Sequence, residues 1–83
     1  MTQEELYRIY EEVTYFIHHN CLDSYYVGDA EFTSYGTIEF NVYGSSGQGD
    51  CNEWVEYWSI DTDGKINTGD NVYDNIEDFK RDW

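Results

Sequence analysis

The chain contains no lysine or arginine between Arg8 and Lys65, although acidic residues continue throughout that stretch. Its carboxylates are interleaved with tyrosine and tryptophan, in what the residue pattern indicates is the strand-rich middle of the protein. A segment of this kind makes a surface of a single electrostatic sign. No catalytic motif lies within it, so any function has to be argued from that surface. The acidic residues of the stretch are Glu11, Glu12, Asp23, Asp29, Glu31, Glu39, Asp50, Glu53, Glu56, Asp61 and Asp63.

Length and composition predict a single domain, residues 1–83, with one modest core. Apolar residues make up 40% of the chain and aromatic residues 19%, which is too rich in large side chains for a disordered acidic tail. The formal net charge is -14, from 18 acidic and 4 basic residues. Because self-repulsion at this level destabilises a compact state, the charge excess indicates a use beyond solubility.

The charge also limits the partners that the protein can have. A compact chain of this length is roughly 30 Å across, and its 14 net charges correspond to about 24 Å of duplex DNA. Direct binding to nucleic acid or to an anionic membrane is therefore not expected. The chain has no apolar run of about 18 residues and no export or lipidation signal, so we expect a cytoplasmic protein.

The first residues predict an amphipathic helix over residues 3–19. Thr2 and Glu5 fit a capping box, in which each side chain accepts the backbone N–H of the other residue. Apolar residues then recur at three- and four-residue spacing, which places them on one stripe. Arg8 lies opposite the stripe among glutamates, whose repulsion it damps, and Tyr15 is expected to be exposed. The stripe comprises Leu6, Ile9, Tyr10, Val13, Phe16 and Ile17.

The middle of the chain has the two-residue alternation of β-strands. Residues 25–27 and 30–33 are short candidates, and a turn at 34–36 leads to the clearest strand, 37–43. That strand has an apolar inner face and an acidic, aromatic outer face. After the Gly/Ser-rich connection at 44–49, residues 53–60 are β-prone with large apolar groups on both faces, so their inward parity stays open.

Asp63-Gly64 predicts a hairpin turn that returns through residues 65–67. A second amphipathic helix, capped by Asp70 or Asn71, is expected after it. Its apolar face would comprise Val72, Ile76, Phe79 and Trp83. The predicted fold class is α+β, with an N-terminal helix, a three- to four-stranded antiparallel meander sheet and a C-terminal helix. Both helices lie on one sheet face, which leaves the other face open to solvent or a partner.

Two arrangements could suggest a metal site. Residues 59–70 align in part with an EF-hand loop, but Ser59 and Asp70 depart from its usual ligands and no helix pattern precedes them. A hairpin is therefore expected, with a calcium-binding domain as a remote alternative. His18 and His19 point in different directions from a helix end, so a zinc site with Cys21 and Cys51 is not expected. The two cysteines are expected to be free thiols, with a disulfide left open.

No Ser-His-Asp arrangement, phosphate-binding glycine motif or desolvated carboxylate pair is recognisable, so neither enzyme activity nor a cofactor is expected. Tyrosine combined with acids on a sheet face is instead a good recognition surface, because rigid rings supply contact area and carboxylates supply charge complementarity. The alternative is a solubilising acidic coat with incidental tyrosines.

In size, charge, aromatic content and α-β-α layout, the chain resembles the small acidic inhibitors encoded by phages and mobile elements, among them DNA-mimic anti-CRISPR and anti-restriction proteins. The resemblance implies a protein of the host-cell cytoplasm that blocks the basic DNA- or RNA-binding groove of a defence complex such as a CRISPR effector. Its partner would be a basic nucleic-acid-binding protein or ribonucleoprotein. The residues expected to make contact are Glu31, Tyr35, Glu39, Tyr43, Glu53, Glu56, Asp61, Asp63, Asp74, Glu77 and Asp78.

A toxin-neutralising immunity protein, or another acidic protein-interaction module, is the alternative from a different class. Such proteins are also small, acidic and cytoplasmic, and some block a basic nuclease site. The sequence predicts neither the identity of the partner nor the oligomeric state.

Overall fold

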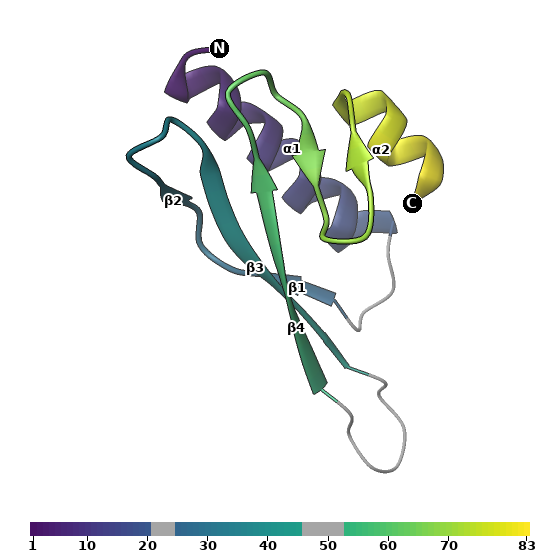
Figure 1. Cartoon of the computed structure of the whole chain (residues 1–83). Coiled ribbons are helices and arrows are strands. Elements are labelled where there is room, and N and C mark those ends of the chain that lie inside the picture. Colours follow the sequence, from purple (N-terminus) through teal and green to yellow (C-terminus); the bar gives the residue numbers. More distant parts are fainter. Residues whose placement is uncertain (21–24, 46–52) are drawn as a thin grey trace.

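The computed structural model describes residues 1–20, 25–45 and 53–83 (Figure 1). Cys21, Cys51 and most of the Gly/Ser-rich connection lie outside the described residues, and so do the predictions made for the two thiols. The elements in chain order are α1 (Gln3–Asn20), β1 (Tyr25–Val27), β2 (Glu31–Phe32), β3 (Ile38–Ser45), β4 (Glu53–Ile60), β5 (Ile66–Asn67), β6 (Val72–Tyr73) and α2 (Ile76–Asp82).

The strands form one antiparallel sheet in the order β1-β3-β4-β5-β6, with β2 also paired to β3. The two longest strands, β3 and β4, pair from Ile38 opposite Ile60 to Ser45 opposite Glu53. β1 and β2 pair with the other side of β3, while β5 pairs with the C-terminal end of β4 and β6 with β5. The predicted α+β class is confirmed, with six described strands instead of three or four.

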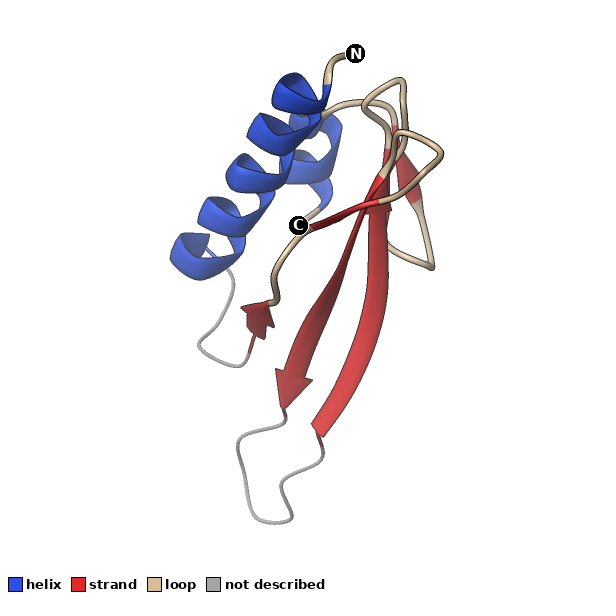
Figure 2. Cartoon of the chain, turned by 90° about the vertical axis from the view of Figure 1, so that its left-hand side faces the viewer, coloured by secondary structure: helices blue, strands red, loops and turns tan. Residues whose placement is uncertain are grey.

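Both helices lie on the same side of the sheet, as predicted, and no helix of the described chain covers the other side (Figure 2). α1 begins with the predicted capping box: the Thr2 hydroxyl accepts the Glu5 N–H at 3.1 Å, and the Glu5 carboxylate accepts the Thr2 N–H at 3.1 Å. Arg8 pairs with Glu4 at 3.7 Å, and Tyr15 is 64% exposed. The first helix is therefore confirmed, one residue longer than predicted.

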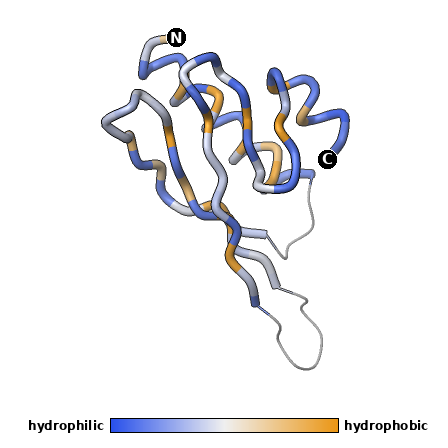
Figure 3. Tube along the Cα trace, viewed as in Figure 1, coloured by the Kyte–Doolittle hydropathy of each residue, from blue (hydrophilic) through white to orange (hydrophobic). Residues whose placement is uncertain are grey.

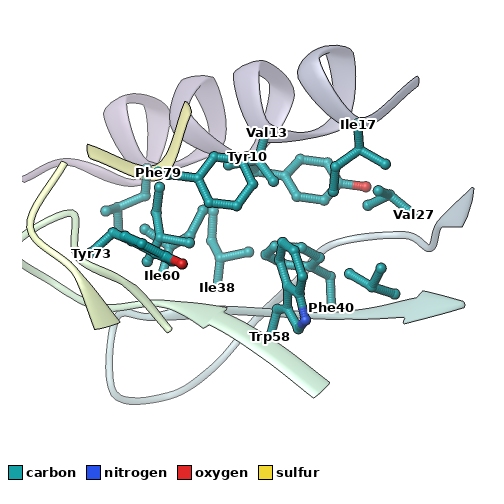
Figure 4. Packing of buried hydrophobic residues seen from close by; sticks show 13 residues of the cluster. Tyr10, Val13, Ile17, Val27, Ile38, Phe40, Trp58, Ile60, Tyr73 and Phe79 are labelled. Carbon is teal, nitrogen blue, oxygen red and sulfur yellow. The ribbon is translucent and has the colours of Figure 1, made fainter. Parts of the chain in front are cut away.

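The core fills the space between the helices and the sheet (Figure 4). Even-numbered residues of β3 face the helices, and the alternation with polar residues is visible in Figure 3. Trp58 of β4 stands opposite Phe40, which settles the parity that the sequence left open. Phe79 of α2 is fully buried, with its ring centroid 5.7 Å from that of Trp58. The buried apolar residues are Leu6, Tyr10, Val13, Ile17, Val27, Ile38, Phe40, Val42, Trp58, Ile60, Ile66, Tyr73 and Phe79.

The C-terminal helix begins later than predicted, and the predicted cap at Asp70 or Asn71 is wrong. The cap is Asn75, whose side-chain oxygen accepts the N–H of Asp78 at 2.9 Å. Asn71 instead closes a turn, because its carbonyl oxygen accepts the N–H of Thr68 at 2.9 Å. Asx residues favour turns and helix caps alike, so their presence did not distinguish the two positions.

Val72, predicted on the apolar face of that helix, belongs to β6 and is 59% exposed. An extended backbone places successive side chains on opposite faces, so Tyr73 enters the core while Val72 points away from it. The ring of Tyr73 lies 5.6 Å from that of Phe79, and its hydroxyl donates to Asp82 at 2.6 Å. Burial of the large tyrosine ring is the physical reason for the extra strand. Ile76 and Phe79 pack against the core as predicted.

Candidate protein-interaction surface

The side of the sheet away from the helices forms an open face. The even-numbered residues of β3 are buried and point toward the helices, so the odd-numbered residues of β3 point away from them. Residues paired directly across the sheet lie on the same face, which assigns the residues of the other strands. We define the open face by the residues on this side: Tyr26, Glu31, Glu39, Asn41, Tyr43, Ser45, Glu53, Val55, Tyr57, Ser59, Asn67 and Val72.

The centre of the open face is aromatic. Tyr57 is 74% exposed and Tyr26 is 62% exposed, which is unusual for rings of this size. The ring centroids of Tyr26 and Tyr43 are 6.0 Å apart, and the Asn41 amide donates to the Tyr43 hydroxyl at 3.3 Å. The rings of Tyr26 and Tyr43 are therefore held by their neighbours and have less conformational freedom to lose on binding.

One end of the open face is acidic. Glu31 of β2 stands directly opposite Glu39 of β3, so their Cα atoms are about 5 Å apart. Together with Asp29 they line a hollow of 490 Å³ whose wall also includes Tyr57 and Ser59. Like charges directly opposite each other destabilise a sheet. The arrangement therefore costs the free protein stability, and a positive group placed in the hollow would relieve that cost.

The salt bridges of the described residues lie elsewhere. They join Arg8 to Glu4, Lys65 to Asp74, and Arg81 to Asp78, at 3.6 to 4.0 Å, and all are largely exposed. Since residues 9–64 contain no lysine or arginine, the strands β1 to β4 cannot supply a basic side chain to the open face. The carboxylates there have no positive neighbour within their own strands.

The other end of the open face lies at the far end of the β3–β4 ribbon. Glu53 stands there opposite Ser45. A second hollow of 550 Å³ is lined by these two residues together with Tyr25, Tyr26, Tyr43, Gly44, Trp54 and Val55. At about 3.3 Å per residue, the six residue steps from Glu39 to Ser45 place Glu53 roughly 20 Å along the ribbon from Glu39.

The residues expected from the sequence to make contact fall into four groups. Glu31, Glu39, Tyr43 and Glu53 lie on the open face. Tyr35, 85% exposed, precedes β3, and Asp61 and Asp63 lie in the β4–β5 turn. Asp74, Glu77 and Asp78 lie around the start of α2. Glu56 faces the helices. The structure therefore places four of these residues on the open face, where Glu31 and Glu39 are opposite each other and Glu53 lies at the far end, and distributes the others over separate surfaces.

Glu56 has a structural partner on each side along its own strand. Its carboxylate accepts the indole N–H of Trp54 at 3.1 Å and that of Trp58 at 3.3 Å. It stands opposite Val42, on the helix side of the sheet. Since Trp58 is buried, this carboxylate satisfies a donor that would otherwise face the core.

Asp61 also has a local role, because its carboxylate accepts the backbone N–H of Asp63 at 2.9 Å and that of Lys65 at 3.0 Å. This bonding closes the predicted hairpin turn, in which Gly64 has a φ of 85°. Residues 59–70 therefore run through a hairpin rather than a helix-flanked loop. Within residues 1–20, 25–45 and 53–83, no three or more metal-ligating side chains are grouped closely enough to hold a metal ion.

Comparison with known proteins adds no relative. No family model, curated protein or solved structure matches the chain. No helix of the described residues is long and apolar enough to cross a membrane. The function must therefore be argued from the surface itself.

Sequence reasoning missed three residues that the structure adds to this surface: Asp29, Tyr26 and Tyr57. The signal for Tyr57 was present but ambiguous, because Trp54 and Trp58 alternate with Val55 and Tyr57 in β4 and either set could point inward. Only the pairing of β4 with the unambiguous strand β3 resolves the choice.

Proposed function

We propose that the protein is a non-catalytic acidic inhibitor that occupies the basic DNA- or RNA-binding groove of a defence complex, such as a CRISPR effector, in the host-cell cytoplasm. Carboxylates of the open face would stand where phosphates stand in the natural ligand. The observation that carries this proposal is the acidic end of the open face, where Glu31 and Glu39 are held opposite each other without a basic residue in their strands.

The overall charge density supports the same reading. The molecule measures 43 × 26 × 20 Å, and duplex DNA of that length would carry about 25 charges. The protein's net charge of -14 is therefore about half of that carried by a duplex of equal length. Such a field accelerates encounter with a basic groove at low salt, and it weakens as the Debye length falls below about 10 Å.

The tyrosines give the surface more than charge. An arginine that enters the acidic hollow can pair with a carboxylate of Glu39 through its planar guanidinium and lie against the ring of Tyr57. A lysine can make the charge contact but stacks less well. We therefore expect arginine, more than lysine, to dominate the partner's side of the contact.

The test compares two double variants with the same change in net charge. Glu31→Lys with Glu39→Lys reverses the acidic hollow, while Glu11→Lys with Glu12→Lys reverses exposed residues of α1. The tagged wild-type protein is first used to capture partners from host lysate over a salt series, and added DNA or guide RNA is used as competitor. The hollow variant should lose the captured partner and the α1 variant should retain it. Partners that are neither basic nor nucleic-acid-binding, or equal retention by both variants, would refute the proposal.

A further inference from the structure

Among the residues that the structure describes, residues 53–57 of β4 have a neighbouring strand on one side only. β3 pairs with β4 along its whole length, whereas β5 pairs only with Ser59 and Ile60. In an antiparallel ladder, alternate residues direct their N–H and C=O groups to opposite sides. The Asp61 N–H donates to the Lys65 carbonyl at 3.0 Å, which places odd-numbered residues of this strand on the β5 side.

The odd-numbered residues Glu53, Val55 and Tyr57 therefore turn their backbone groups toward the open edge of β4. Within the part of the chain that the structure describes, no strand pairs with them there. This half of the β3–β4 ribbon extends beyond both helices in two perpendicular views (Figures 1 and 2). A row of unpaired N–H and C=O groups along a strand edge is a template for another strand.

We propose that an extended basic segment of the partner adds to this edge as a further strand. This inference rests on the proposed function and specifies how the partner is held. The main-chain bonds would supply part of the affinity, and alternate side chains of the added strand would supply the specificity. Those on the open face would stand beside Glu53, Val55 and Tyr57, and those on the other face beside Trp54 and Glu56.

The chemistry of the edge selects a basic occupant. Glu53 is exposed, and Trp54 and Tyr57 are 40% and 74% exposed, so a carboxylate and aromatic rings are accessible within five residues. Arginine and lysine side chains complement both kinds of group. A second copy of this chain is the wrong occupant, because each copy carries a net charge of -14 and each edge carries its own glutamates.

The probe is a synthetic peptide, acetyl-Arg-Thr-Arg-Val-Arg-Thr-Arg-amide, whose charges alternate with β-prone residues. Its matched control is the same peptide N-methylated throughout, which keeps every charge but cannot donate main-chain hydrogen bonds. Binding is measured by calorimetry at low salt, and NMR hydrogen exchange identifies which amides become protected. We expect at least tenfold weaker binding of the methylated peptide, with new protection at the amides of Val55 and Tyr57 and none at Glu56.

A pair of protein variants tests the same edge. Val55→Pro removes a donor that points away from β3, so the β3–β4 bonds are kept. Val55→Thr retains the donor and is the control. The proline variant should bind the unmethylated peptide at least tenfold more weakly, and the threonine variant should bind it as the wild type does. Should the proline variant unfold, the two peptides on wild-type protein decide the question alone.

The outcomes separate this inference from the proposed function. Equal binding of both peptides would mean that charge alone holds the partner, which overturns strand addition and leaves charge recognition standing. A peptide with glutamate in place of arginine that binds equally well would overturn the basic occupant and count against the proposed function too. A failure of the basic peptide to bind, or self-association of the protein through β4 in sedimentation experiments, would overturn strand addition.

Discussion

Replacement of Glu56 offers a sharp test of how the sheet is held together. In Glu56→Ala the indole N–H groups of Trp54 and Trp58 lose their shared acceptor. Trp58 is 1% exposed, so its N–H is left without a partner next to the core, which costs about 1–3 kcal/mol. Trp54 is 40% exposed, so water replaces most of its bond. We expect the free energy of unfolding to fall by about 2 kcal/mol in total. Removal of one negative charge reduces self-repulsion and offsets only a small part of this loss.

The assay is urea unfolding at 25 °C followed by tryptophan fluorescence, with the indole N–H proton of Trp58 followed by NMR. A loss of about 2 kcal/mol in a domain of this size lowers the melting temperature by roughly 8–16 °C. Glu56→Gln should be intermediate, because the two indoles donate to different carboxylate oxygens and glutamine replaces one of these with an NH2 group that cannot accept. Glu53→Ala, on the open face of the same strand, is the control and should change stability by less than about 0.5 kcal/mol. If Glu56→Ala unfolds at the same urea concentration as Glu53→Ala, then the carboxylate is not the acceptor that the geometry indicates.

Three further predictions concern pH, packing and salt. The hydrogen bond donated to Asp82, and then burial, raise the pKa of Tyr73 above its ordinary value of 10.0. The stability that the protonated phenol contributes is present below that value and is lost as pH rises through the raised pKa. The urea midpoint should therefore fall less steeply above pH about 10 in Tyr73→Phe than in wild type. At Gly44 a Cβ would lie 2.5 Å from ring carbons of Trp54, so Gly44→Val should lower the free energy of unfolding in urea by about 1–3 kcal/mol. Adding Trp54→Ala should recover much of that loss, whereas additive losses would show that the ring is not the obstacle. Finally, the described ion pairs are exposed and weak, while the net charge is -14. Calorimetry should therefore find a higher melting temperature in about 0.15 M NaCl than in about 0.01 M. A lower melting temperature on adding salt would mean that attraction between charges, not self-repulsion, dominates.

The sequence predicts most reliably the elements in which one periodicity is unmistakable. α1 has an apolar stripe and a reciprocal cap, Thr2 with Glu5, and both are found. β3 has a clear alternation of apolar and polar residues between Ile38 and Val42, and every even-numbered position of the strand is buried. In each case local propensity and burial pattern indicate the same structure, which is the condition under which a local argument is safe.

The sequence is ambiguous where two readings bury similar amounts of apolar surface. In β4 either face offers large side chains, so the choice depends on the partner strand. Around Val72 and Tyr73, a helix and a short strand would each bury one large apolar side chain. The hydrogen bond from Tyr73 to Asp82 favours the strand, but it forms only in the folded protein. The same limitation applies to the surface. The sequence shows which residues carry carboxylates, but only the strand pairing shows that Glu31 and Glu39 lie opposite each other.

The closeness of Trp58 and Trp83 has a spectroscopic consequence. Their ring centroids are 5.1 Å apart with planes inclined at 69°, so the two indoles behave as coupled chromophores and should produce an exciton couplet in circular dichroism. Because one indole belongs to the sheet and the other follows α2, the couplet reports whether the last helix is docked. It would vanish when the chain end detaches, even while the remaining strands stay paired, and so provides an intrinsic optical probe that needs no label.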